Sequence, residues 1–101
     1  MNLLNTLIDK NNTEPIRLTD DKGRSITFEQ IAIIPLREEN VMCCILQPIG
    51  TKEIGIKEKL YAFRLVPTQD GEDVNLILEE NKKIKKKVFL EYKRMLKNER
   101  R

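Results

Sequence analysis

Histidine and tryptophan are absent from this chain of 101 residues, and aromatic residues make up only 5% of it. Histidine is the commonest general base in enzymes and a frequent ligand of zinc and other transition metals. Its absence removes most catalytic dyads and triads and most transition-metal sites together. The sequence therefore predicts a protein that is not an enzyme and that holds no metal ion and no other cofactor.

Cysteine is scarce, because the adjacent Cys43 and Cys44 are the only two thiols. Without a second pair they can build neither a four-ligand zinc site nor a disulfide framework. We expect two reduced, small apolar side chains on a strand rather than a redox centre, which is typical of a cytosolic protein.

Long hydrophobic runs are also lacking. No stretch approaches the roughly 20 apolar residues that a membrane-spanning helix needs. Residues 1–8 have neither the basic start, nor the long apolar run, nor the cleavage site of a secretory signal. The expected localisation is therefore cytoplasmic, with no membrane partner.

Glycine is rare, and its four copies are too scattered for a loop that cradles phosphate. Carboxylates gather in three predicted turns, at residues 20–21, 38–39 and 70–73. In turns, acidic side chains accept backbone hydrogen bonds and face solvent. We therefore interpret these clusters as turn residues and not as metal or acid–base sites.

The length of the chain is enough for one domain with a modest core. We expect residues 1–15 to form an N-terminal segment and linker, and residues 16–101 to form a single α+β domain. Four apolar residues of the segment recur at helical spacing, which allows a short N-terminal helix: Leu3, Leu4, Leu7 and Ile8.

Five segments have the alternation or the continuous apolar character of strands. Turn residues between them include Gly23, which we expect in a left-handed conformation. The apolar positions change parity between Phe28 and Ile31, which predicts a bulge or bend near Gln30, or burial on both faces. Pro35 is expected to end the second strand. The predicted strands, in an antiparallel meander with the third at its centre, are about 16–19, 25–34, 41–47, 60–67 and 74–78.

Residues 79–97 change to helical periodicity. Glu79 and Glu80 are expected in the first turn, where carboxylates interact favourably with the helix dipole. Six apolar side chains fall within about 140° of arc and predict a stripe that packs on one face of the sheet: Ile84, Val88, Phe89, Tyr92, Met95 and Leu96. The expected fold class is therefore α+β, a five-stranded antiparallel meander with one long C-terminal helix packed on one face.

Five short phrases lie along this pattern: Asp21-Lys22-Gly23, Phe28-Glu29, Ile45-Leu46-Gln47-Pro48, Tyr61-Ala62-Phe63-Arg64-Leu65-Val66 and Asp70-Gly71-Glu72-Asp73. With the meander and the C-terminal helix, they resemble a small family of bacterial proteins, domain of unknown function 1292. The resemblance spans roughly residues 16–96, and it implies the same meander and helix. That family has no established activity and no known catalytic residues, and its helices are typically rich in glutamate, whereas this helix is basic.

Charge is distributed unevenly. Residues 79–101 hold ten Lys or Arg against four Glu, a net charge of +6, whereas residues 1–78 hold nine against twelve, a net charge of −3. Such cations favour either a solvated helix face or contacts with phosphates, although no aromatic residues stand among them to stack on bases. Seven cations lie opposite the apolar stripe and are called the basic face: Lys82, Lys83, Lys86, Lys87, Lys93, Arg94 and Lys97.

Apolar residues occupy both faces of the predicted sheet, and one helix cannot cover both. The other face could be covered by the N-terminal segment, by a second copy of the chain or by a different partner. If Ile26, Phe28, Phe63 and Leu65 face the helix, residues of the opposite parity form a candidate partner face, although the pattern leaves the parity of the third strand open. That candidate face consists of Met42, Cys44, Leu46 and Ala62.

These observations favour a non-catalytic protein-interaction or regulatory module that presents a sheet face or edge to another protein or to a second copy of itself. The alternative is a nucleic-acid-associated or ribosome-associated protein that acts through the basic face.

Overall fold

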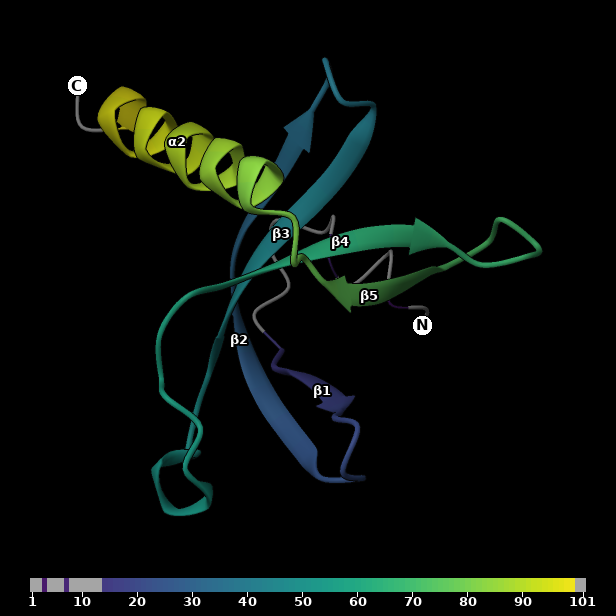
Figure 1. The fold of residues 1–101 in the computed structure, drawn as a ribbon, viewed down its shortest axis with the longest axis vertical. Helices are drawn as coiled ribbons and strands as arrows, with labels where there is room; N and C mark the ends of the chain where they lie inside the picture. Colours follow the sequence, from purple (N-terminus) through teal and green to yellow (C-terminus); the bar gives the residue numbers. More distant parts are fainter. Residues whose placement is uncertain (1–2, 4–6, 8–13, 100–101) are drawn as a thin grey trace.

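The computed structural model describes residue 3, residue 7 and residues 14–99 (Figure 1). It has an α+β fold in which five strands precede a C-terminal helix, as the sequence predicted. The elements are β1 (Ile16–Thr19), β2 (Ser25–Leu36), β3 (Val41–Pro48), the 3-10 turn η1 (Lys52–Ile54), β4 (Tyr61–Pro67), β5 (Val74–Leu78) and α2 (Lys82–Glu99).

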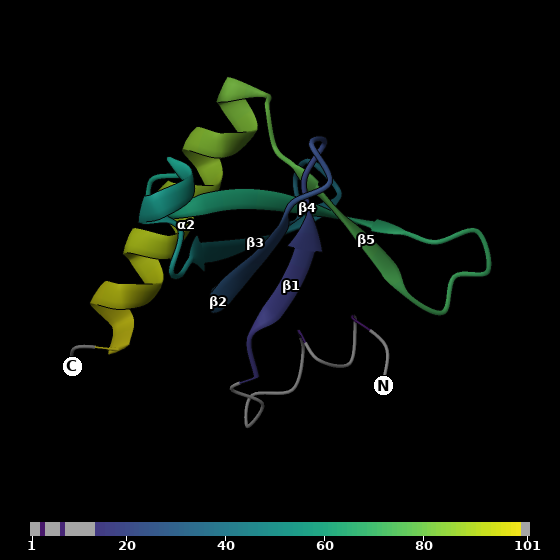
Figure 2. The ribbon, with the colours of Figure 1, turned by 90° about the horizontal axis from the view of Figure 1, so that it is seen from below.

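The five strands form one sheet in the order β1-β2-β3-β4-β5, and each strand is antiparallel to its neighbours. The predicted meander with its third strand at the centre is therefore confirmed. Figures 1 and 2 show that the sheet curls into a half-barrel, with α2 outside it. β1 and β5 are the two edges of this half-barrel. Gly23 lies in the turn between β1 and β2 with φ at 79°, as expected.

β2 carries the predicted irregularity. Its register against β3 shifts between Gln30 and Ala32, which is a β-bulge. The extra residue turns Phe28 and Ile34 to opposite faces, although both have even numbers. Pro35 does not end this strand, which continues to Leu36. β1 pairs only with the first part of β2, so one side of β2 is free at Pro35, where a missing N–H costs little.

The sheet buries apolar side chains on both faces. The face that carries α2 buries Ile34, Leu36, Cys43, Ile45 and Ala62 beneath Val88. The inner, concave face buries Leu7, Ile16, Ile26, Phe28, Cys44, Leu46, Phe63, Leu65 and Val74. The condition that Ile26, Phe28, Phe63 and Leu65 face the helix is therefore not met. The alternation within a strand predicted which of its own residues share a face, but neither the alignment of neighbouring strands nor the face that receives the helix.

α2 begins three residues later than predicted. Asn81 caps it, because its Oδ1 accepts the N–H groups of Lys83 and Ile84 at 3.0 and 3.2 Å. Glu79 consequently lies before the helix, not in its first turn. There it is buried at 5% exposure and its Oε2 accepts the Arg64 Nε–H at 2.7 Å.

Only the first four of the six residues in the predicted apolar stripe pack against the core cluster of the sheet. Val88 is fully buried, and Ile84, Phe89 and Tyr92 are partly buried against the same cluster. Met95 and Leu96 are each 37% exposed, because α2 extends past the strands, as Figure 1 shows. Lys87 forms an ion pair with Glu39 of the β2–β3 turn, which also holds the helix in place.

Part of the concave face is covered by Leu3 and Leu7 of the N-terminal segment. Leu7 is 2% exposed within the concave cluster, and Leu3 packs against that cluster. The Gln30 Nε2–H donates to the Leu7 carbonyl oxygen at 2.6 Å, and the Leu3 N–H donates to Asp73 Oδ2 at 3.2 Å. Leu3 and Leu7 are helical. The rest of the predicted N-terminal helix, including Leu4 and Ile8, lies outside the described residues.

Candidate functional site

The predicted partner face does not exist as an exposed surface. Cys44 and Leu46 are fully buried in the concave cluster. Ala62 is 3% exposed and lies on the opposite face, beneath α2, because it pairs with Ile45. Only Met42, at 41% exposure, remains accessible. The prediction that these four side chains form one face for a partner is therefore wrong, since the sheet uses three of them for its own two cores.

The two cysteines separate to the two cores, with Cys43 beneath α2 and Cys44 on the concave side. Both are free thiols with no exposed surface. Burial raises the pKa of the Cys43 thiol to about 11 and that of the Cys44 thiol to about 12. Both thiols therefore stay protonated at neutral pH and are poor nucleophiles.

We predict that neither thiol reacts with Ellman's reagent in the native protein at neutral pH. A thiol must be both accessible and ionised to attack the reagent, and in the folded protein these two thiols are neither. In concentrated urea the same samples should release two equivalents of the coloured product. Rapid release of one equivalent from the folded protein would contradict the burial of these residues.

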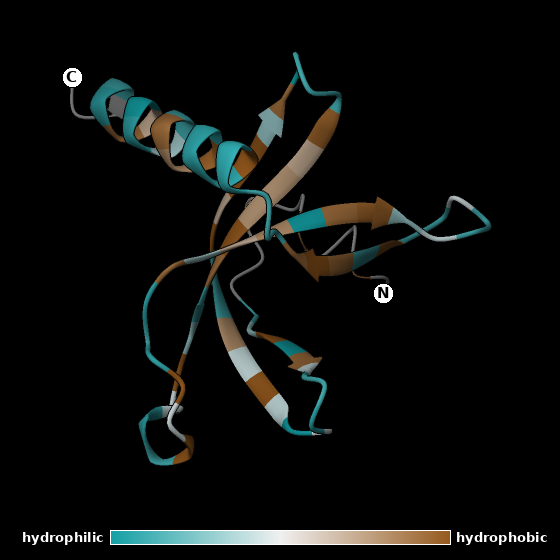
Figure 3. Ribbon diagram, in the orientation of Figure 1, coloured by the Kyte–Doolittle hydropathy of each residue, from teal (hydrophilic) through white to brown (hydrophobic). Residues whose placement is uncertain are grey.

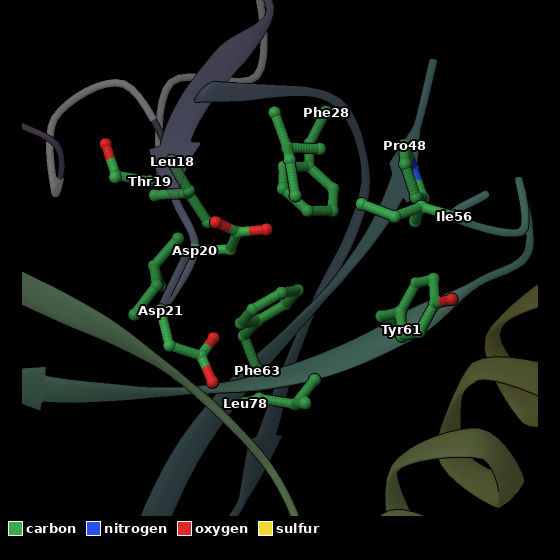
Figure 4. A pocket seen from close by; sticks show the side chains of 12 residues that line it. Leu18, Thr19, Asp20, Asp21, Phe28, Pro48, Ile56, Tyr61, Phe63 and Leu78 are labelled. Atoms are coloured by element: carbon green, nitrogen blue, oxygen red, sulfur yellow. The ribbon is translucent and has the colours of Figure 1, made fainter. Parts of the chain in front are cut away.

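An apolar pocket of about 370 Å³ lies at the open end of the concave face, and is called the half-barrel pocket (Figure 4). Phe28 and Phe63 meet edge to face at its floor, with ring centroids 5.5 Å apart and ring planes at 79°. Ile56, from the loop between β3 and β4, forms part of the wall. The complete lining is Leu18, Thr19, Asp20, Asp21, Ile26, Phe28, Pro48, Ile56, Tyr61, Phe63, Leu76 and Leu78.

The half-barrel pocket lies on a part of the concave face that neither Leu3 nor Leu7 lines. Leu7 is buried in the same cluster as Ile16 and Val74, whereas the pocket extends from Leu18 of β1 to Leu78 of β5. Leu78 is 45% exposed. A pocket of this size is within the range that holds small ligands or a large side chain.

Asp20 and Asp21 line the mouth of the pocket, and they differ in whether the protein itself binds their carboxylates. Asp20 Oδ1 accepts the N–H groups of Lys22 and Arg24, and Asp20 Oδ2 is 2.8 Å from Arg24 Nε. Partial burial raises the pKa of Asp20, but these hydrogen bonds and the Arg24 charge outweigh it and hold the pKa below its usual value. Asp21 is exposed and has no hydrogen bond or ion pair within the described residues. Asp21 is thus the carboxylate available to a ligand.

The far side of the pocket mouth is formed by Tyr61. Its hydroxyl donates to the Lys57 carbonyl oxygen at 3.3 Å, and the Lys59 ammonium lies 5.3 Å from its ring centroid. These contacts hold the Tyr61 ring at the edge of the pocket, where the ring forms part of the lining.

All seven residues of the basic face are exposed, as predicted, and Figure 3 shows hydrophilic residues along the whole of α2. Lys87 is paired with Glu39, which raises the pKa of this lysine, and Arg94 is paired with Glu91 at 2.9 Å. Within residues 14–99, no ion pair engages the other five: Lys82, Lys83, Lys86, Lys93 and Lys97.

In two of the three acidic turns a carboxylate accepts backbone hydrogen bonds, as expected, whereas in the β2–β3 turn Glu39 pairs with Lys87. Asp70 Oδ1 accepts the Thr68 hydroxyl at 2.6 Å and the Glu72 N–H at 3.0 Å, which lowers the pKa of Asp70. In the described part of the chain, no group of three cysteine, aspartate or glutamate residues is arranged to hold a metal ion. No helix of that part has the length and apolar character needed to cross a membrane.

The half-barrel pocket is not among the features that the sequence predicts. Leu18, Leu76 and Leu78 share the parity that faces the concave side, so alternation could have placed them together once β1 and β5 were recognised as the two edges. Ile56 gave no periodic signal, because it lies in a loop.

Searches of family models, of curated proteins and of solved structures found no match to this chain. The resemblance to domain of unknown function 1292 stays a prediction.

Proposed function

We propose that this protein is a non-catalytic interaction module whose partner protein inserts an apolar side chain into the half-barrel pocket. The observation that carries the proposal is the pocket itself, an accessible space of about 370 Å³ floored by Phe28 and Phe63. An accessible apolar concavity in a chain with 35% charged residues favours a binding role.

The chemistry of the lining favours a protein anchor over a reacting substrate. Its walls are aliphatic and aromatic, and its carboxylates belong to one turn at the mouth. Since Asp20 is committed to Arg24, only Asp21 is free to meet a charge. A partner segment with a large apolar residue next to a lysine or arginine matches this arrangement.

A second candidate function is binding of nucleic acid, including ribosomal RNA, by the basic face. Its support is the group of five exposed lysines without an ion pair among the described residues. Each phosphate neutralised by a lysine releases counterions, so such binding would fall steeply between about 50 and 200 mM salt.

Affinity capture with two loop variants tests the pocket. Ile56→Glu places a carboxylate in the pocket wall, whereas Ile54→Glu changes a residue of the same loop that is 42% exposed and outside the lining. Each protein is immobilised and exposed to nuclease-treated lysate from the cells that produce it. We expect the wild type and Ile54→Glu to retain the same specific proteins, and Ile56→Glu to lose them.

Retention of the same proteins by Ile56→Glu, or no specific protein on the wild type, would refute the pocket as the binding site. If retained material instead disappears with nuclease and with salt, the basic face is the functional surface. Far-UV circular dichroism of both variants shows whether they are folded.

A further inference from the structure

The outer side of β5 has unpaired backbone groups next to the half-barrel pocket. Glu79 N–H donates to the Ala62 carbonyl at 3.0 Å, and Thr68 N–H donates to the Asp73 carbonyl at 3.0 Å. Hydrogen-bonded pairs alternate along an antiparallel ladder, so Asn75 and Ile77 also direct their backbone groups to β4. The backbone groups of Val74, Leu76 and Leu78 therefore point outward.

One of these three outward amides is already engaged. The Val74 N–H donates to Asp73 Oδ1 at 2.8 Å, and the other oxygen of this carboxylate accepts the Leu3 N–H. No hydrogen bond within the described residues reaches the outer backbone groups of Leu76 and Leu78. Leu3 thus meets the chain just before β5, while the second half of this edge has no hydrogen-bond partner among the described residues.

The two edges of the sheet differ in how they are protected. β1 has four residues, carries Arg17 and follows Pro15, which are features that discourage further strand pairing. β5 has the sequence VNLIL, with no charge, no proline and no glycine, and Ile77 and Leu78 are 52% and 45% exposed. β5 is therefore the edge suited to receive another strand.

The directions of β1 and β5 are compatible with one added strand between them. In a meander of five antiparallel strands, β1 and β5 run in the same direction. A sixth strand antiparallel to β5 would also be antiparallel to β1, and would extend the half-barrel toward closure. Both edges border the half-barrel pocket, with Leu18 and Thr19 on one side and Leu76 and Leu78 on the other.

We propose that the partner binds as an extended segment that adds to the free edge of β5, antiparallel to it, at Leu76 and Leu78. This inference rests on the proposed function and names the mode of binding at the same pocket. Backbone hydrogen bonds to β5 hold the segment, alternate apolar side chains enter the pocket, and a lysine or arginine meets Asp21. The partner is therefore a protein segment with apolar alternation and a basic residue.

Amide hydrogen exchange in the wild type tests this mode directly. The probe is a peptide selected from a random displayed library by binding to the wild-type protein and rejected by Ile56→Glu. We expect the peptide to slow exchange at the Leu76 and Leu78 amides at least about tenfold. The amides of Asn75 and Ile77, which face β4, should change less. Unchanged exchange at Leu76 and Leu78 in the saturated complex would refute strand addition.

Two substitutions at one position give an independent readout. Leu78→Ala and Leu78→Pro both remove the leucine side chain from the pocket lining, but only proline also removes the outward backbone N–H. If the peptide adds to β5, Leu78→Pro should bind at least about tenfold more weakly than Leu78→Ala. If the two Leu78 variants bind the peptide equally well and Ile56→Glu still fails to bind it, the pocket remains the binding site and strand addition is refuted. If no peptide can be selected whose binding depends on Ile56, both the proposed function and strand addition are refuted.

Discussion

Replacing Val88 with aspartate is expected to lower the free energy of unfolding by at least about 3 kcal/mol. Val88 is the one fully buried side chain among the described residues of α2, and it packs on Ile34, Leu36, Cys43, Ile45 and Ala62. A carboxylate at this fully buried position would lose its hydration, and the apolar side chains around it cannot replace those hydrogen bonds. Urea denaturation followed by circular dichroism measures the loss.

The same variant should change thiol reactivity in a selective way. Cys43 lies beneath α2, whereas Cys44 lies on the concave side among residues that α2 does not touch. Loosening of the helix should therefore allow one equivalent of Ellman's reagent to react at Cys43 while Cys44 stays protected.

Leu90→Asp is the matched control, because Leu90 is in the same helix and is 52% exposed. It should change the free energy of unfolding by less than about 0.5 kcal/mol. Similar losses for the two variants, or equal reactivity of both thiols in Val88→Asp, would contradict the packing described for α2.

Replacing Arg64 with methionine should cost about 2 kcal/mol of folding free energy at neutral pH. Arg64 Nε lies 2.7 Å from Glu79 Oε2, and the Glu79 side chain is 6% exposed. Methionine keeps much of the apolar stem but leaves the carboxylate buried without its cation. Glu79 Oε1 also accepts the Asn81 N–H, so the loss should extend to the start of α2.

A double-mutant cycle isolates this ion pair. Glu79→Gln removes the charge and should recover part of the loss when it is combined with Arg64→Met, because no unpaired charge is then buried. Thermal or urea unfolding of the wild type, the two single variants and the double variant gives the coupling energy. Strict additivity of the two substitutions would show that the pair contributes no coupling to stability.

The predictable parts of this fold are those set by contacts between neighbours in sequence. The change of apolar parity after Phe28 correctly indicated the bulge near Gln30, and Gly23 correctly indicated a left-handed turn residue. The prediction that Pro35 ends the second strand was wrong, because the effect of a proline on a strand depends on whether the adjacent edge of that strand is paired. The residue that caps the helix is Asn81. The prediction that Glu79 and Glu80 lie in its first turn was wrong, since Glu79 is buried against Arg64 of β4.

The candidate site was less predictable than the fold. Met42, Cys44, Leu46 and Ala62 looked like one face because the strand offsets were unknown. Ala62 pairs with Ile45, so it lies opposite Cys44 and Leu46. The half-barrel pocket depends on the curl of the sheet, which brings β1 and β5 to one opening although they are more than fifty residues apart in the chain.

The sequence by itself determined the order and type of the elements, the exposure of the basic face and the lack of histidine chemistry. These properties follow from local periodicity and composition. Only the tertiary structure decided which sheet face receives α2, where the N-terminal segment packs and which end of the half-barrel stays open. Those outcomes depend on strand register and sheet curl, because a shift of one residue exchanges the two faces and the curl sets which distant edges meet.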